Sequence, residues 1–214
     1  MGLIERRERE REEIRRKILD AARDLFMREG YDRVTMRRIA DAIEYSPTTI
    51  YNHFEDKDDL VQAMCHEDFA RLFDHLSQQP PPADPIDAIR KLGLGYAHFG
   101  IEHPNQYRFM FMTPGKFEHP EDRDFSPGER AFGLLQGAVA AAIDGGFFRP
   151  GDVDTVAQVL WASMHGAVAL IITLHPQMWP HVPARPDLVQ QVVDAAIRGF
   201  LALPSPTPSA PTRH

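Results

Sequence analysis

Two short helical segments follow one another closely in the front part of the chain, and each opens with its own cap signal. Thr35 precedes the segment 36–43, and Ser46 with Pro47 precedes the segment 48–54. Serine and threonine cap helix N-termini, and proline suits the first helical position. Two short helices joined by a tight turn, with a supporting helix on either side, are the parts of a helix-turn-helix. We therefore expect that motif here.

Longer amphipathic helices are expected before and after the motif. Apolar residues recur at the helical period ahead of Gly30, which stands where a C-terminal cap is wanted, and again over Lys57–Gln78. The run Pro80–Pro85 ends that second helix, because proline lacks a backbone donor and clashes with the preceding turn. Further periodic segments lie at residues 86–103, 104–111, 127–144, 153–173 and 187–202, with a polar loop at 113–126. The predicted fold class is all-α.

Composition favours an ordinary globular protein of the cytoplasm. A chain of 214 residues with 43% hydrophobic content can bury a sizeable core. The single cysteine, Cys65, excludes an internal disulfide framework and a cysteine-rich zinc module, which fits a reducing compartment. The longest apolar run, Ala162–Leu174, is interrupted by Ser163 and His165 and is too short for a membrane span. The charged N-terminus lacks the apolar centre of a signal peptide.

The distribution of charge along the chain indicates a nucleic-acid partner more clearly than the net charge does. A net charge of −7 and a pI near 5.8 are unfavourable for a protein that must contact phosphates. Arginine is nevertheless concentrated at the front of the chain, at positions 6, 7, 9, 11, 15, 16, 23, 28, 33, 37 and 38. A clustered basic stretch of this kind is typical of a domain that binds double-stranded DNA.

Four stretches of the front region resemble the DNA-binding signature of the tetracycline-repressor (TetR) family. They are Gly30-Tyr31, Thr35–Ala40, Ser46–Phe54 and Lys57–Leu60, and their order and spacing agree with the family pattern over roughly residues 11–70. The resemblance implies an N-terminal three-helix helix-turn-helix domain followed by a helical C-terminal domain for ligand binding and dimerisation. It also implies a function, that of a homodimeric repressor which binds a palindromic operator and is released by a small-molecule effector.

The candidate DNA-binding residues combine this resemblance with the geometry of the major groove. Small polar side chains at the start of a recognition helix can approach base edges, while flanking donors bind phosphates. The candidates are Thr35, Arg37, Arg38, Ser46, Pro47, Thr48, Thr49, Tyr51, Asn52, His53 and Lys57. Tyr51 suits packing and phosphate contact equally, and Phe54 favours a core position.

Two positions depart from the family pattern. Glu44 stands in the turn, where relatives usually have glycine, and a non-glycine residue in a left-handed turn costs about 1 kcal/mol. Its charge also repels DNA. Pro47 stands where relatives often have lysine, so one common phosphate contact is expected to be absent.

The rear part of the chain has many large, soft side chains, as apolar ligand cavities between helices do. A small apolar or aromatic effector is expected among Tyr96, Phe99, Tyr107, Phe132, Trp161 and His165. The stretch Trp161–Gly166 resembles a tryptophan-histidine-glycine motif of one C-terminal subgroup of the family. For His165 two interpretations stay open, a satisfied histidine in a helix interface and a contact to the effector.

The resemblance also implies that the last two helices form a four-helix dimer interface. The candidate interface residues are Gly166, Leu170, Val193, Ile197 and Phe200. A two-fold axis would present two recognition helices to half-sites roughly 35 Å apart.

These expectations give a domain plan. It has a charged helical extension at 1–10, a helix-turn-helix domain at 11–56 with its motif at 35–54, a C-terminal regulatory and dimerisation domain at 57–203 that includes the connecting helix 57–78, and a disordered tail at 204–214. We expect no cofactor, no bound metal and no catalysis. The alternative function is a helical enzyme that binds a metal or substrate, for which His98, Glu102 and His103 have the most suggestive spacing.

Overall fold

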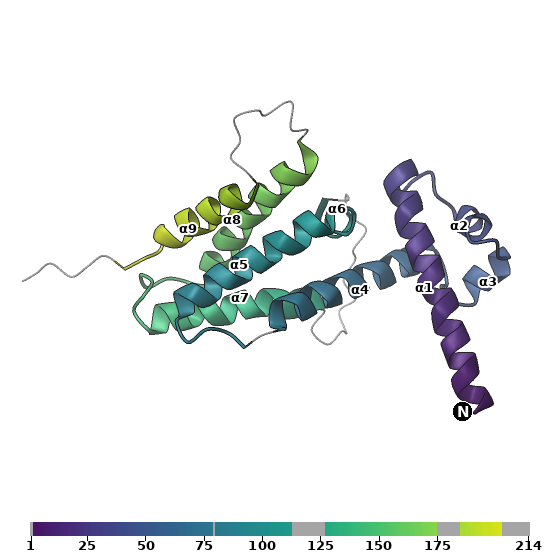
Figure 1. Ribbon diagram of the computed structural model, residues 1–214, viewed down its shortest axis with the longest axis horizontal. Helices are drawn as coiled ribbons and strands as arrows, with labels where there is room; N and C mark the ends of the chain where they lie inside the picture. Colours follow the sequence, from purple (N-terminus) through teal and green to yellow (C-terminus); the bar gives the residue numbers. More distant parts are fainter. Residues whose placement is uncertain (1, 79, 113–126, 175–184, 203–214) are drawn as a thin grey trace, which may run out of the picture. The chain divides into compact units, whose positions relative to one another are not determined.

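The computed structural model describes residues 2–78, 80–112, 127–174 and 185–202, and these residues are almost entirely helical. The helices are α1 (Leu3–Glu29), α2 (Met36–Ala42), α3 (Pro47–Tyr51), α4 (Lys57–Ser77), α5 (Pro85–Glu102), α6 (Pro104–Met112), α7 (Pro127–Asp144), α8 (Val153–Thr173) and α9 (Arg185–Arg198), shown in Figure 1. Strand pairing in the described residues is limited to one isolated bridge between Phe148 and Leu201. The all-α fold class is confirmed. The loop 113–126 and the tail 204–214 lie outside the described residues.

Helix starts follow the cap signals in the sequence. The Thr35 hydroxyl oxygen accepts the backbone N–H of Arg38 at 3.1 Å, and that of Ser46 accepts the N–H of Thr49 at 3.2 Å. Asp152 caps α8 in the same way. Each cap satisfies a donor that the first helical turn leaves without an internal partner.

The last helix is shorter than the pattern of apolar residues predicts, because it ends at Arg198 and not at Ala202. The N–H of Arg149 donates to the Phe200 carbonyl at 2.9 Å, and the N–H of Ala202 donates to the Phe147 carbonyl at 2.9 Å. These bonds pair the chain after α9 with the segment between α7 and α8. The residues involved therefore leave the helical hydrogen-bonding pattern, although their side chains keep its apolar character.

The described residues form two compact units. The first unit contains α1, α2, α3, α6 and α4 as far as Phe73. Its core is one apolar cluster that includes the fully buried Ile18, Ile39 and Ile50. In this unit α2 contacts α3, and α1 contacts both α2 and α6 (Figure 1).

The second unit contains the end of α4 from Asp74, together with α5, α7, α8 and α9. Helix α8 packs against α5 and α9, and these two also contact each other. Ile89, Val139, Leu160 and Val168 are fully buried within this unit. Helix α4 therefore contributes its first part to one unit and its end to the other.

Candidate nucleic-acid interface

The two capped helices α2 and α3 present a polar surface to solvent. Their inward side chains, among them Ile39 and Ile50, are fully buried, which fixes the opposite face outward. The predicted DNA-binding residues are exposed except for Thr49, His53 and Lys57, which are half-buried. Tyr51 is 55% exposed, although it is a large aromatic residue. Phe54 is buried in the core of the first unit, as expected.

The turn between α2 and α3 contains the left-handed backbone conformation that we expected at Glu44, where relatives usually have glycine. Glu44 has a φ of 61° and is the non-glycine residue with positive φ in the described part of the chain. The N–H of Tyr45 donates to the Ala40 carbonyl at 3.0 Å, which closes the turn. The side chain of Glu44 is exposed beside α3 and adds a negative charge to the surface.

The cap of α3 already uses the hydroxyl group of one predicted base-reading residue. The hydroxyl oxygens of Ser46 and Thr49 are 3.0 Å apart and hydrogen-bonded. Thr49 is half-buried, whereas Thr48 is exposed. Of the two threonines, Thr48 is therefore the more accessible to a base edge.

Lys57 has a structural role that its position in the motif does not reveal. Its ammonium donates to the carbonyl oxygens of Tyr31 at 3.0 Å and Val34 at 3.1 Å, and it lies 3.9 Å from the centre of the Tyr31 ring. The Tyr31 hydroxyl in turn donates to Asp58. Burial and this carboxylate raise the pKa of Tyr31. Lys57 thus holds the loop before α2 against the start of α4.

His53 lies among basic side chains of α1. Burial lowers its pKa, and the positive charges of Arg11 and Arg15 lower it further, with Glu12 acting in the opposite direction. The imidazole is therefore neutral near neutral pH and can serve as a hydrogen-bond donor or acceptor.

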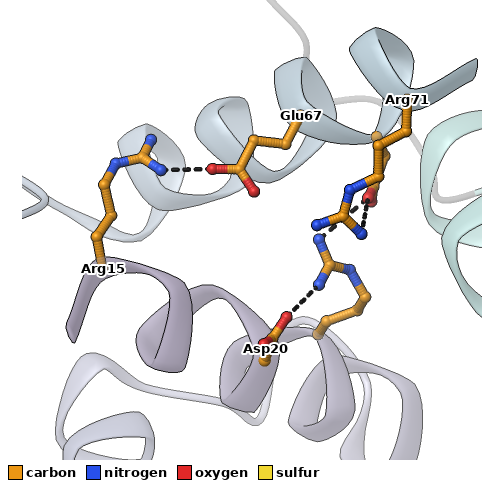
Figure 2. Close-up of polar contacts among 6 residues, drawn as sticks. Arg15, Asp20, Glu67 and Arg71 are labelled. Atoms are coloured by element: carbon orange, nitrogen blue, oxygen red, sulfur yellow. Dashed lines mark hydrogen bonds and ion pairs between the residues drawn. The ribbon is translucent and has the colours of Figure 1, made fainter. Parts of the chain in front are cut away.

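A network of charged side chains joins α1 to α4 in the first unit (Figure 2). Arg15 pairs with Glu67 at 2.5 Å on the partly exposed side. Arg23 pairs with Asp68 at 3.1 Å, and the Asp68 side chain is completely buried. Burial raises the pKa of Asp68, and the nearby guanidinium group of Arg23 opposes that rise. Figure 2 also shows Asp20 and Arg71 at the ends of the network.

This buried pair was not among the predicted sites, although the spacing of its residues in the sequence contains a signal for it. Arg23 follows Leu19 by four positions and precedes Phe26 by three, so it falls on the apolar face of α1. Asp68 lies four residues after Met64, on the buried face of α4. Two opposite charges on two apolar faces predict a pair, because an unpaired charge in a core is very costly.

In the second unit, three of the predicted effector-binding residues form a hydrogen-bonded chain. The Trp161 indole N–H donates to the Tyr96 hydroxyl oxygen at 3.2 Å, and that hydroxyl lies 3.2 Å from Nδ1 of His165. Tryptophan can only donate, so the Tyr96 oxygen accepts that bond, and the neutral imidazole of His165 can accept from or donate to the Tyr96 hydroxyl at Nδ1, according to its tautomer. Burial lowers the pKa of His165, in agreement with a neutral ring.

The structure brings together part of the predicted effector site. The Phe132 ring contacts Trp161 edge-on, with centroids 6.3 Å apart, beside the chain formed by Tyr96, Trp161 and His165. Phe99 lies against His75 in the same unit. Tyr107 belongs to the first unit, where its ring contacts Phe111 at 4.8 Å.

Two protein-family models match the chain. The model of bacterial regulatory proteins of the tetR family matches residues 18–64. The model of the tetracyclin repressor-like C-terminal domain matches residues 89–197, more than half of the chain's 214 residues. The chain belongs to the tetR family. Membership in the tryptophan-histidine-glycine subgroup stays a prediction.

Individual relatives match mainly the front region. The HTH-type transcriptional repressor Rv1474c of Mycobacterium tuberculosis is 48% identical over 58 residues, which are 27% of this chain and 31% of the relative. The HTH-type transcriptional repressor AcnR of Corynebacterium glutamicum is 39% identical over 96 residues, 45% of each protein. The chain thus spans less than half the length of these curated relatives.

The fold as a whole is shared with solved tetR-family structures. A TetR family transcription regulator from Marinobacter aquaeolei VT8 superposes with a TM-score of 0.72 at 20% identity, covering 91% of this chain and 98% of that one. At this identity the match shows the fold alone.

The predicted dimer residues of this tetR-family chain fall into two groups. Leu170 is 50% exposed, and a side chain added at Gly166 would meet nothing within 4 Å. Val193 and Ile197 are each only 2% exposed, because they face the chain's own α5 and α8. These two side chains therefore pack within their own chain, and their place in the dimer interface stays a prediction. Phe200 packs on Phe148, with ring centroids 5.8 Å apart.

The spacing that suggested a metal site gives an ion pair on a solvated helix face. His98 and Glu102 are 3.1 Å apart, and both side chains are more than half exposed. Within the described ranges, no three histidine, cysteine or acidic side chains gather closely enough to hold a metal ion.

Helix α8 is the helix in the described part of the chain that is long and apolar enough to cross a membrane. One of its faces, which carries Val156, Leu160 and Val168, is buried in the second unit. The opposite face carries the exposed Val159 and Leu170.

Proposed function

We propose that this tetR-family protein is a cytoplasmic, homodimeric transcriptional repressor that binds a palindromic operator in double-stranded DNA. A small apolar or aromatic effector releases it. The proposal assigns the chain no catalytic role. Its domains would be those predicted from the sequence. The helix-turn-helix domain at 11–56 would bind DNA, and the domain at 57–203 would bind the effector and dimerise.

The observation that carries this proposal is the surface formed by α2 and α3. Two short helices with side-chain caps hold Thr48, Tyr51 and Asn52 in exposed positions on a buried apolar base. Arg37 is exposed on the neighbouring helix and supplies positive charge for phosphates. Rigid placement of polar and basic groups is what groove recognition requires.

The exposed face of α8 supports a dimer. Val159, Ala162, Gly166 and Leu170 recur at helical spacing and leave an apolar stripe in contact with solvent. A large exposed apolar stripe is unfavourable in water and marks an interface. The charged and polar residues elsewhere on the surface favour a second copy of the chain as its cover, in place of lipid.

The effector region would act on DNA binding by linkage. Tyr96, Phe132, Trp161 and His165 combine aromatic surface with groups that can donate or accept hydrogen bonds. An effector that prefers another packing of these helices would shift the two recognition helices of the dimer. Linkage is reciprocal, so operator DNA would weaken effector binding by the same factor, typically about 5- to 150-fold.

A gel-shift titration against DNA flanking the protein's own gene tests the proposal. Tyr51→Phe should weaken operator binding roughly two- to tenfold while leaving Tm unchanged, because it removes one exposed hydroxyl. Thr48→Ala should change sequence preference more than affinity. Lys57→Met is the contrast, since it should lower Tm as well as DNA affinity by releasing the loop at Tyr31. Specific binding absent from every flanking fragment, with the protein folded, would refute operator recognition there.

The dimer is tested by Leu170→Glu, which places a charge on the exposed stripe without entering the core. Light scattering should report a dimer for the parent and a monomer for this variant. Asp144→Lys, an exposed change at the end of α7, serves as the control and should stay dimeric. A dimer that survives Leu170→Glu would place the interface elsewhere.

A further inference from the structure

The second unit contains an open groove that the proposed effector region does not include. It encloses about 670 Å³ and is bounded by the end of α4, the proline segment 80–85, α5 and α7. Every lining residue belongs to the second unit. The volume lies within the range of about 300–1,000 Å³ usual for small-molecule sites. We call this cavity the α4–α5–α7 groove.

One wall of the groove is a row of very small residues on α7. Gly133, Gly137 and Ala141 recur every fourth position and line the same face. Eight residue steps separate Gly133 from Ala141, so the row is about 12 Å long at a rise of 1.5 Å per residue. The wall therefore has the form of a long trough.

The two glycines of this row are not required by packing within the described structure. A Cβ atom added at Gly137 would meet nothing within 4 Å, and one added at Gly133 would meet only the side-chain oxygen of Gln136 at 4.0 Å. Gly93 in the same unit is different, because there a Cβ would press on Met164 and Val193. Each interior helix glycine costs roughly 0.5–1 kcal/mol relative to alanine. At Gly133 and Gly137 the missing side chains leave the space beside α7 unfilled.

Lys91 is the charged residue of an otherwise uncharged lining. Its ammonium donates to the carbonyl of Pro80 at 3.2 Å, which holds it at the proline wall. The ion pairs between described residues do not include Lys91. An ammonium group has three donors, so it can donate to this carbonyl and still donate to an anion.

We propose that the α4–α5–α7 groove binds an elongated amphiphile with an aliphatic body and one anionic head group. The body lies along the trough of Gly133, Gly137 and Ala141, and a carboxylate or similar head pairs with Lys91. The length of the trough favours a chain over a compact ring. The single cation favours one negative charge, because a second charge would be desolvated without a partner.

This site shares no residue with the cluster around Tyr96, Trp161 and His165, and it goes beyond the proposed function. Its occupant is aliphatic and anionic, whereas the proposed effector is apolar or aromatic. Binding to the groove can be measured on DNA-free protein, so it does not depend on operator recognition.

Calorimetric titration of the full chain with decanoate and with decanol, both below their aggregation concentrations, tests the proposal. Decanoate should bind about tenfold more tightly than the uncharged alcohol, because only the carboxylate pairs with Lys91. Lys91→Gln should reduce decanoate affinity to that of decanol and leave decanol unchanged. Gly137→Leu should abolish binding of both, since its side chain enters the trough at a position where an added Cβ atom meets nothing within 4 Å.

Three controls make the result decisive. Gly133→Leu repeats the block at a second position, for use if Gly137→Leu has a lowered Tm. Trp161→Ala should retain decanoate binding, which separates the groove from the aromatic cluster. Equal affinities for decanoate and decanol, or full binding by a folded blocking variant, would overturn the proposal. Gel shifts on the same preparations distinguish the failures: operator binding without decanoate binding refutes the groove site alone, and the reverse refutes the proposed function alone.

Discussion

The two units of the chain differ in what their interiors contain. In the first unit a charged pair, Arg23 and Asp68, is buried between α1 and α4. In the second unit the described residues include no buried charged side chain, and glycines on α7 leave the α4–α5–α7 groove unfilled. Both choices lower stability relative to a fully packed apolar core.

The difference fits two kinds of task. A buried ion pair keeps its contact in only one arrangement of its helices, so it favours a single geometry for the unit that carries α2 and α3. An unfilled groove between helices has no such requirement and can admit a ligand. The first unit therefore favours one fixed arrangement of its helices, and the second unit leaves a groove that a ligand can occupy. Each prediction below tests one side of this contrast.

The largest expected effect is on the buried pair. Asp68→Ala should lower the free energy of unfolding by about 3 kcal/mol, because it removes the buried counter-charge of the Arg23 guanidinium and leaves only the largely exposed Asp20 as its partner. Denaturant unfolding measures the change. Glu67→Ala is the matched control one residue away, since it removes a partly exposed partner of Arg15 and should cost about 0–1 kcal/mol.

The double variant Arg23→Met with Asp68→Leu completes this test. Apolar residues of similar volume should recover most of the stability lost in Asp68→Ala. Operator affinity should then show whether the pair also fixes geometry. If Asp68→Ala costs no more than Glu67→Ala, the buried pair does not organise the first unit.

Helix positions and caps were predictable because their causes are local. Thr35, Ser46 and Pro47 determine where α2 and α3 begin through bonds to residues three positions away. The short end of α9 was not predictable, because its cause is a hydrogen bond between Arg149 and Phe200, which are distant in sequence.

The candidate sites divide in the same way. The exposed face of α2 and α3 follows from helical periodicity, and so does the exposure of Tyr51. The binding of Lys57 to the carbonyls of Tyr31 and Val34 depends on a loop conformation that no residue pattern encodes. Val193 shows a limit of the same reasoning, since periodicity finds an apolar face and cannot say which neighbour covers it.

The next largest effect concerns the turn of the first unit. Glu44→Gly should raise the free energy of unfolding by up to about 1 kcal/mol, because glycine adopts the positive φ without strain. It should also tighten operator binding by removing a negative charge beside α3. Glu44→Gln keeps the strain and removes the charge, so it separates the two effects. A Glu44→Gly protein no more stable than Glu44→Gln would show that the turn is unstrained.

A change in stability of similar size is expected in the second unit, where a glycine is replaced and not introduced. Gly137→Ala should stabilise the protein by about 0.5–1 kcal/mol, because alanine favours the helix and its methyl group enters open space. Gly93→Ala is the matched change on α5 and should destabilise, since its methyl group presses on Val193. Thermal unfolding of both variants compares them. Similar shifts in Tm would mean that the groove is closed in solution.

The smallest effect is the pH dependence of the second unit, which rests on the burial of His165 beside Tyr96. Burial lowers the pKa of His165, so in the folded protein the ring loses its proton at a lower pH than in the unfolded chain. Between these two pKa values the unfolded state binds more protons, and stability therefore rises with pH. The contribution is fully present above the unfolded value of about 6.5 and is lost as the pH falls toward the folded one.

Unfolding measured from about pH 5 to pH 8 should therefore show stability decreasing with acid, and His165→Asn should reduce that slope. Asparagine supplies an acceptor oxygen close to the position of Nδ1 but does not titrate, so the bond from Tyr96 can persist. His53 in the first unit also has a lowered pKa and contributes with the same sign. His53→Asn measures that share separately. A slope that is unchanged in His165→Asn and removed by His53→Asn would assign the acid sensitivity to the first unit, and would show that the hydrogen-bonded chain at Trp161 tolerates protonation.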